Sequence, residues 1–263
     1  MSDHCKPIGF FDSGVGGISV LKTAFQLMPC ENYIYYGDNI NAPYGEKTEG
    51  EIKALSLAAG RFLYEKGVKA IVMACNTATS AAVMMMREEF NIPVISMEPA
   101  VKPALSEIRN GKILVLATPA TIAQERYLTL LKRLDATDKV INIGCEGLAD
   151  LIEEGQIDSK TIFSYLTEKL SGLSGIQIDS VVIGCTHYSF IENEIKDFLL
   201  HTYHIDCKIF DGRHGTVRQL SRVLDKNDIR CCKNTLSGSI EYFSSGNDHH
   251  IEIFKTLFNN FKS

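Results

Sequence analysis

The sequence predicts an α/β protein made of two pseudo-symmetric, doubly wound domains with mostly parallel sheets. Short runs rich in valine and isoleucine alternate with helical patterns along nearly all of the 263 residues, as expected of strands that helices cover on both faces. One arrangement occurs twice, because Cys75-Asn76-Thr77 and Cys185-Thr186-His187 each follow a short apolar run, 110 positions apart. Two equivalent loops that each present a thiol predict one site, enclosed in a cleft between the domains.

The expected strands are charge-poor segments of three to five residues, as short as buried strands commonly are. They are Ile8–Phe11, Tyr33–Tyr36, Ala70–Ala74, Val94–Met97, Ile113–Ala117, Val140–Ile143, Ser180–Ile183, Lys208–Phe210 and Ser239–Phe243. Apolar residues at helical spacing predict helices over Thr48–Lys66, Thr77–Phe90, Ile122–Leu134, Ser159–Leu170, Phe190–Leu200 and Asp248–Phe261. Strands that alternate with helices in this way are typical of parallel sheets.

The domain boundaries follow from the repeat. Asp12 follows the first expected strand and Thr118 follows the fifth, and each precedes its cysteine loop by a similar distance. Prolines around Met97-Glu98-Pro99 mark the expected crossing from one unit to the other. We therefore expect residues 1–97 and 208–263 to form the first domain and residues 98–207 to form the second.

Composition and charge exclude several classes of protein. The formal net charge is −5 and no basic stripe is present, which argues against a nucleic-acid partner. The first residues lack the apolar core of a signal peptide, and the longest uncharged stretch, 70–86, is too short for a membrane span. We expect a cytoplasmic protein with no membrane contact.

The eight cysteines include no C-x-x-C pair, so neither a zinc ribbon nor a thioredoxin-like motif is indicated. His201, His204 and Cys207 have a loose metal-ligand spacing, but no second cluster completes a four-ligand site. The sequence therefore predicts no metal site and mostly reduced cysteines.

Polar loops follow the carboxyl ends of the expected strands, which is the edge where open α/β sheets bind ligands. Asp12-Ser13-Gly14-Val15-Gly16-Gly17 fits an anion cradle at a helix N-terminus, or a tight turn capped by Asp12 or Ser13. The turn Asn41–Gly45 could bind a carboxylate through exposed amides and the Tyr44 hydroxyl, or it could be a plain loop.

The two cysteines carry the chemical hypothesis. A cysteine between a strand and a helix N-terminus is expected to have a lowered pKa, which favours the thiolate at Cys75. Asn76 and Thr77 supply donors and acceptors for a small polar ligand. His187 stands two residues from Cys185 and could take or return its proton. The alternative for either loop is a buried structural thiol.

Together the loops Phe11–Gly17, Tyr36–Asp38, Ala42–Gly45, Ala74–Ala78 and Gly184–Tyr188 resemble those of the glutamate racemase family, within the aspartate/glutamate racemase superfamily. The resemblance covers about Ile8 to Phe261. It implies that two α/β domains enclose the substrate and that L- and D-glutamate are interconverted without a cofactor, which supplies D-glutamate for peptidoglycan synthesis. The implied partner is the small-molecule substrate alone, and a homodimer is left open.

The resemblance also implies a role for particular residues. Cys75 and Cys185 would be the acid/base pair, with Asp12 and His187 assisting them. The implied substrate-binding residues are Asp12, Ser13, Tyr44, Gly45, Asn76, Thr77, Thr186 and His187, and the implied supporting residues are Asp38, Thr118, Thr121 and Glu153.

Three other functions fit part of the pattern. An aspartate racemase differs from a glutamate racemase only in its preferred substrate. A cysteine amidase using Cys185 and His187 predicts a covalent acyl-enzyme and no exchange of the substrate α-proton. An amino-acid binding protein fits two lobes around a cleft, but two cleft cysteines and the expected lack of a signal peptide argue against it.

Overall fold

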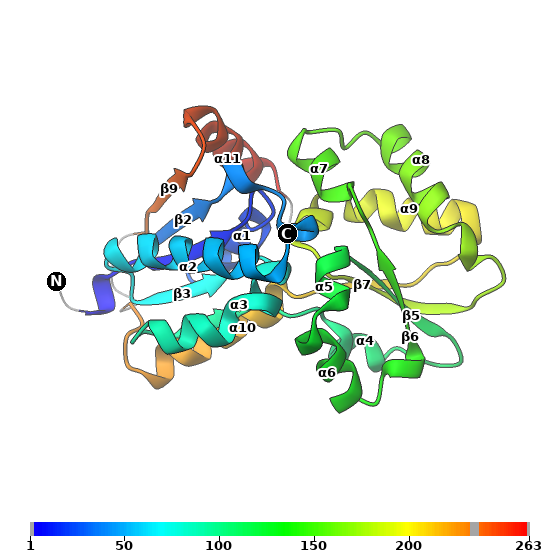
Figure 1. Ribbon diagram of the computed structural model, residues 1–263, viewed down its shortest axis with the longest axis horizontal. Helices are drawn as coiled ribbons and strands as arrows, with labels where there is room; N and C mark the ends of the chain where they lie inside the picture. The colour runs from blue at the N-terminus through cyan, green and yellow to red at the C-terminus, as the bar shows by residue number, and fades with distance from the viewer. Residues whose placement is uncertain (1–2, 232–236, 262–263) are drawn as a thin grey trace.

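The computed structural model describes residues 3–231 and 237–261 as two lobes side by side, each with a central sheet flanked by helices (Figure 1). The sheet of the first lobe has five parallel strands in the order β4-β3-β1-β2-β9. These strands are β1 (Ile8–Asp12), β2 (Tyr33–Gly37), β3 (Ala70–Met73), β4 (Val94–Ser96) and β9 (Ile240–Ser244).

The sheet of the second lobe has four parallel strands in the order β6-β5-β7-β8. These strands are β5 (Lys112–Ala117), β6 (Val140–Gly144), β7 (Ile178–Ile183) and β8 (Lys208–Asp211). Read from the opposite edge, the order β8-β7-β5-β6 repeats β4-β3-β1-β2 of the first sheet. The predicted pseudo-symmetric α/β fold is therefore confirmed, and each expected strand is found within two residues of its predicted ends.

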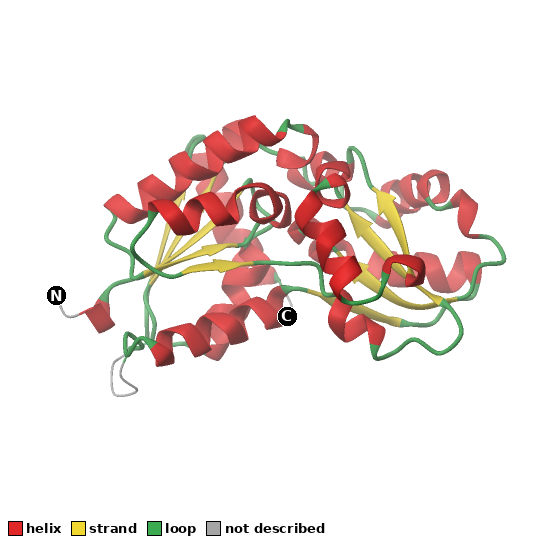
Figure 2. Cartoon of the chain, turned by 60° about the horizontal axis from the view of Figure 1, so that its bottom comes forward, coloured by secondary structure: helices red, strands yellow, loops and turns green. Residues whose placement is uncertain are grey.

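Helices cover both faces of each sheet (Figure 2). The first lobe has α1 (Ile18–Leu27), α2 (Glu49–Glu65), α3 (Asn76–Glu89), α10 (Arg213–Lys226) and α11 (Asp248–Asn260). The second has α4 (Val101–Leu105), α5 (Pro119–Ala123), α6 (Glu125–Arg133), α7 (Leu148–Glu153), α8 (Ser159–Lys169) and α9 (Glu192–Tyr203). The single helix expected over Ile122–Leu134 is interrupted, because Gln124 adopts an extended conformation between α5 and α6.

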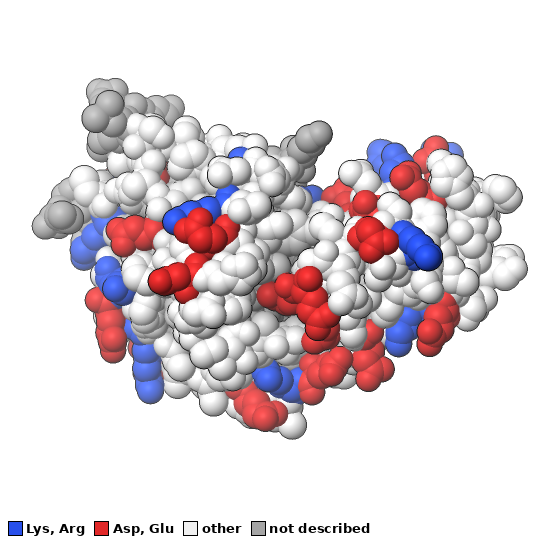
Figure 3. Space-filling view, turned by 90° about the horizontal axis from the view of Figure 1, so that it is seen from above, with Lys and Arg blue, Asp and Glu red and all other residues white. Residues whose placement is uncertain are grey.

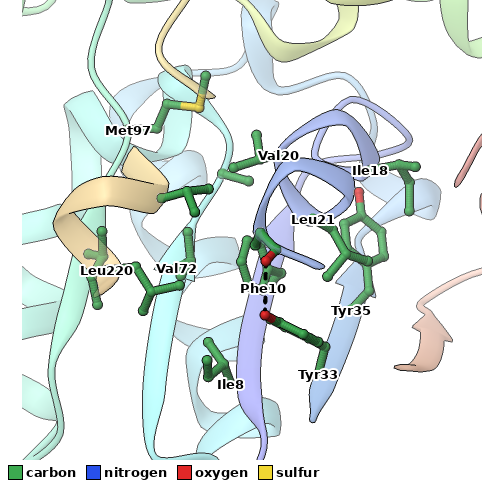
Figure 4. Packing of buried hydrophobic residues seen from close by; sticks show 14 of the residues in the cluster. Ile8, Phe10, Ile18, Val20, Leu21, Tyr33, Tyr35, Val72, Met97 and Leu220 are labelled. Carbon is green, nitrogen blue, oxygen red and sulfur yellow. Dashed lines mark hydrogen bonds between the residues drawn. The ribbon is translucent and has the colours of Figure 1, made fainter. Parts of the chain in front are cut away.

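Alternation along the strands divides each lobe into two cores. Phe10 of β1 packs with α1 and α10 on one face, where it lies beside Tyr33 and Leu21 (Figure 4). Its neighbour Phe11 packs with α2 and α3 on the other face. The aromatic pair Phe10–Tyr33 is arranged edge to face, with ring centroids 5.9 Å apart, which fills the core beneath α1.

Two helices, α4 and α10, each pack on the lobe opposite to the one that contains the preceding strand. Helix α4 follows β4 of the first sheet but packs on β5, β7 and β8, whereas α10 follows β8 and packs on α1 and β4. Strand β8 pairs with β7, so the chain leaves the second lobe at Gly212 and not after Cys207 as the expected boundary had it. A Cβ at Gly212 would lie 2.8 Å from the Glu98 carbonyl oxygen, so the two chain crossings touch each other.

The face in Figure 3 shows acidic and basic side chains interspersed over both lobes. Among the residues that the structure describes, no helix has the length and apolar character needed to cross a membrane.

Candidate active site

Cys75 lies between β3 and α3 and caps the helix through its sulfur. The Ala78 N–H donates to Cys75 Sγ over 3.4 Å, and the thiol donates to Ser13 Oγ over 3.7 Å. The side chain is only 5% exposed. Strand β3 is apolar and buried throughout, so the first polar residues after it are placed at the edge of the sheet.

Cys185 holds the equivalent position in the second lobe. It follows β7 and precedes a six-residue 3-10 helix, η6 (Thr186–Ile191). Its sulfur lies 3.7 Å from His187 Nδ1, and the residue is 6% exposed. Each of the two matching loops therefore presents one buried thiol at the end of a strand. That both thiols serve one site stays a prediction.

The expected lowering of the Cys75 pKa is wrong for this closed structure. Burial raises the pKa of the Cys75 thiol to about 12, and the Asp12 carboxylate and Cys185 add to the effect. The hydrogen bonds with Ala78 N–H and Ser13 act in the opposite direction but do not compensate. Loss of solvation therefore outweighs the helix N-terminus here.

His187 forms a buried ion pair. Its Nε2 lies 2.6 Å from Glu153 Oε1, and the histidine is 2% exposed. Burial alone would lower the histidine pKa, but Cys185 and Glu153 hold it well above its usual value. Burial would raise the pKa of Glu153, yet His187 and the Val15 N–H lower it overall. We therefore assign an imidazolium and a carboxylate to this pair.

Asp12 connects the lobes at the end of β1. Its carboxylate accepts hydrogen bonds from Gly14 N–H and from Thr186 Oγ1, each over 3.0 Å. Burial raises its pKa to about 6, against the opposing influence of His187. The contact between Asp12 and Thr186 could not be foreseen from the sequence, because the two residues are far apart along the chain.

Three threonine side chains form a second link between the two lobes. Thr77 Oγ1 of the first lobe lies 2.9 Å from Thr118 Oγ1 and 3.1 Å from Thr121 Oγ1 of the second. Thr118 also caps α5 by accepting from Thr121 N–H over 3.2 Å. The structure thus brings these three expected residues together at the N-terminus of α3.

Asn76 is the clearest sign of a ligand. Its side chain is buried, and neither its Nδ2 nor its Oδ1 has a hydrogen-bond partner among the described residues. A buried amide without partners is costly, of the order of 1–3 kcal/mol, and such groups are rare in native structures. A bound polar molecule would satisfy it.

Tyr44 does not offer its hydroxyl to the cleft. The hydroxyl donates to Asp38 Oδ2 over 2.6 Å, and Asn41 Nδ2 donates to both oxygens of the same carboxylate. Tyr44 and Asp38 therefore support the loop in which Gly45 lies against Thr118. The sequence gave no reason to select Asn41.

The glycines of the first loop permit the lobes to approach. A Cβ at Gly14 would overlap the Glu153 carboxylate, and one at Gly16 would meet Thr186 and His187. Neither sequence interpretation, a cradle or a tight turn, foresaw this close approach of the opposite lobe. Tyr35 was also missed, although its hydroxyl donates to the Gly14 carbonyl over 2.6 Å and fixes the same loop.

Comparisons with known proteins agree with this geometry. A family model described as Asp/Glu/Hydantoin racemase matches residues 19–220. The chain belongs to that family. The match includes both cysteine loops and the Thr118, Thr121 and Glu153 positions, while Asp12 lies just before it.

Full-length relatives extend the family match to the ends of the chain. A glutamate racemase of Clostridium botulinum (strain Okra / Type B1) is 46% identical over 260 residues, which is 98% of this chain and 99% of the relative. The solved structure of glutamate racemase isoform RacE1 from Bacillus anthracis has a TM-score of 0.84 at 29% identity, covering 98% of this chain and 95% of that one. Glutamate racemase from Francisella tularensis in complex with D-glutamate has a TM-score of 0.83 at 27% identity, with the same coverages.

Proposed function

We propose that this protein is a cofactor-independent glutamate racemase that uses Cys75 and Cys185 as its two acid/base groups. The observation that supports the proposal is that two buried thiols follow equivalent strands, β3 and β7, one in each lobe. The names of the full-length relatives support glutamate as the substrate.

Two bases on opposite sides match the chemistry of inversion. One thiolate takes the α-proton, and the electron pair of the broken C–H bond stays on the α-carbon. The opposite thiol then gives its proton to the other face, so the product has the same composition and the opposite configuration. Each direction of the reaction starts from the opposite protonation state, which explains why both groups are of one residue type.

The surroundings of the two thiols differ. With a pKa of about 12, Cys75 is a neutral thiol at neutral pH and is ready to donate. On the other side, the raised pKa of His187 arises partly from Cys185. The His187 imidazolium lies 3.7 Å from the Cys185 sulfur, which is close enough to exchange a proton with it.

The site must also stabilise a carbanion, because a proton beside an ionised carboxylate is a very weak acid. Fixed hydrogen-bond donors in a water-excluded site are the strongest means that a protein has for this. The unpartnered amide of Asn76 is one such donor. Backbone amides near Ser13, Thr77 and Thr186, all buried residues, supply others.

The proposal includes a cellular role. D-glutamate formed in the cytoplasm would supply peptidoglycan synthesis, as the resemblance to glutamate racemases implies.

Proton NMR of L-glutamate in D₂O, with purified protein and no added cofactor, tests the proposal alongside circular dichroism of the same sample. We expect the α-proton signal to disappear while the optical activity decays to zero. The same assay with aspartate separates the two racemase functions. Absence of exchange with both substrates would reject the proposal and leave the amidase that uses Cys185 and His187.

A further inference from the structure

The loop that carries Cys185 leads into a less regular helical segment than the loop that carries Cys75. Cys75 caps α3, a regular helix of 14 residues. Cys185 leads into η6, and 3-10 segments of six residues are uncommon because their hydrogen bonds have poor geometry. The Ser189 hydroxyl within η6 is buried and has no partner among the described residues. Tertiary contacts must therefore fix this loop.

Phe190, near the end of η6, makes the contact that connects the lobes. It packs against the core beneath α1 in the first lobe and also against the core around α9 in the second. Its ring meets the ring of Phe261 edge to face, at 5.3 Å between centroids and 77° between planes. Phe261 follows α11, which is otherwise anchored in the first lobe through Phe254.

Arg213 completes this contact at the second chain crossing. Its guanidinium lies 4.9 Å from the centre of the Phe261 ring, and its Nη2 lies 3.0 Å from Glu192 Oε2. It also pairs with Asp211 at the end of β8. Since Glu192 directly follows η6, the phenyl ring and the guanidinium together hold the carboxyl end of that segment.

Within the second lobe, Tyr188 and Ile191 anchor η6 in the core, and the Tyr188 hydroxyl donates to the Cys145 carbonyl. Phe261 and Arg213 add contacts from the first lobe at the carboxyl end of this segment. Phe190, Phe261 and Arg213 form part of the wall of a groove of about 1720 Å³ that runs between the edge strands β4 and β8. A side chain removed from this wall is not replaced by close packing, so the loop would gain freedom to move.

We propose that Phe261 and Arg213 are positioning residues that hold the Cys185 loop from the first lobe, and so act on one of the two thiols only. The inference rests on the proposed function. It predicts that loss of the Phe261 ring slows proton transfer at Cys185 and spares proton transfer at Cys75. A displacement of about 1 Å in a reacting group can cost about 10²-fold in rate.

Racemisation itself cannot reveal this asymmetry, because the equilibrium constant between enantiomers ties the two directions together. Elimination of HCl from a β-chlorinated glutamate can reveal the asymmetry, because only one of the two bases acts on each enantiomer. The thiolate takes the α-proton, the C–H electron pair forms the Cα–Cβ double bond, and chloride leaves. Water then hydrolyses the enamine to 2-oxoglutarate and ammonium, which are measured. Cys75→Ser and Cys185→Ser assign each enantiomer to its thiol.

The test compares Phe261→Ala with Phe258→Ala, a matched control in the last turn of α11, just before Phe261. Phe258 packs on Phe25 and Tyr242 within the first lobe. For Phe261→Ala, we expect elimination from the Cys185-dependent enantiomer to slow at least about fivefold more than elimination from the other. Phe258→Ala should lower the melting temperature and leave the ratio of the two rates unchanged. Phe261→Tyr, which keeps the ring, should restore the ratio.

Equal slowing for both enantiomers, or no slowing, would overturn the inference. If Phe261→Ala does not fold, Phe261→Leu gives the same comparison with the apolar bulk retained. Racemisation by the unmodified protein is measured first, so failure of the proposed function is seen separately from failure of this inference.

Discussion

The two cysteine loops occupy equivalent places in equivalent sheets, yet their surroundings differ. Cys75 lies against a helix N–H, a serine hydroxyl and the Asp12 carboxylate, and its pKa is raised to about 12. Cys185 lies against a histidine that is paired with Glu153. A repeated backbone therefore places two identical groups at equivalent positions, while a few neighbouring side chains give each a different environment. Substitutions on each side can break or sharpen this contrast.

Removal of either thiol should have the largest effect. We expect Cys75→Ser and Cys185→Ser each to lower racemisation at least about 10³-fold, as loss of an acid/base group does. Each variant should still eliminate HCl from one enantiomer of a β-chlorinated glutamate. Substantial racemisation by either variant, measured by circular dichroism, would rule out the two-base mechanism.

His187 should matter on one side only. For His187→Gln, we expect elimination from the Cys185-dependent enantiomer to fall about 10²-fold and elimination from the other to change little. Because the His187 pKa is held well above its usual value, the Cys185-dependent rate of the unmodified protein should not fall as the pH rises from 6 to 8. The exposed His201, replaced by Gln, is the control. Equal losses for both enantiomers would place His187 outside the proton path.

Asp12 and Glu153 are both buried carboxylates, but they differ in their partners. Glu153 is paired with His187, whereas no cationic side chain among the described residues is hydrogen-bonded to Asp12. Its folded-state pKa of about 6 exceeds the unfolded value of 3.8, so folding favours the protonated form. This contribution to stability is present below pH 4 and is lost as the pH rises to about 6. Asp12→Asn should therefore increase the free energy of unfolding by about 3 kcal/mol at pH 7.5 and by little at pH 3.5.

Urea unfolding at the two pH values measures this difference. Asp12→Asn should at the same time lower racemisation. A variant that is equally stable or less stable at pH 7.5 would show that hydrogen bonds to Thr186 and Gly14 outweigh the cost of burying the charge.

A substitution at Gly14 tests the contact between the lobes. At this contact, glycines of the first lobe face the side chains of Glu153, Thr186 and His187 from the second. A methyl group at Gly14 would overlap the Glu153 carboxylate. We expect Gly14→Ala to raise KM about tenfold through incomplete closure. Gly50→Ala is the control, since a Cβ at Gly50 meets nothing within 4 Å and should stabilise α2. An unchanged KM for Gly14→Ala would show that closure tolerates the extra group.

Much of the fold follows from local sequence. Apolar runs such as Ala70–Met73 and Val181–Ile183 predict strands because both of their faces are buried, and the polar loops after them identify the ligand edge. The boundary after Cys207 was wrong because strand pairing depends on distant residues: β8 joins β7 by partners that its own sequence does not specify.

The site was less accessible to prediction. The residue types that carry protons could be selected, but their pKa values could not, because the raised pKa of Cys75 comes from burial between two lobes. The role of Gly14 depends on Glu153, 139 positions later in the chain. The packing of Phe261 on Phe190 likewise joins the end of the chain to the second lobe, and no local pattern marks it.

The central claim, that protons leave and arrive on opposite faces through different thiols, is tested most directly by early deuterium incorporation. L-glutamate is incubated with the protein in D₂O and stopped at low conversion, and the two enantiomers are separated and analysed by mass spectrometry. We expect D-glutamate to carry one solvent deuterium while the remaining L-glutamate carries almost none, because the donating thiol has exchanged with solvent. D-glutamate that retains the original proton, or L-glutamate labelled as fast as the product, would mean that a single base serves both faces.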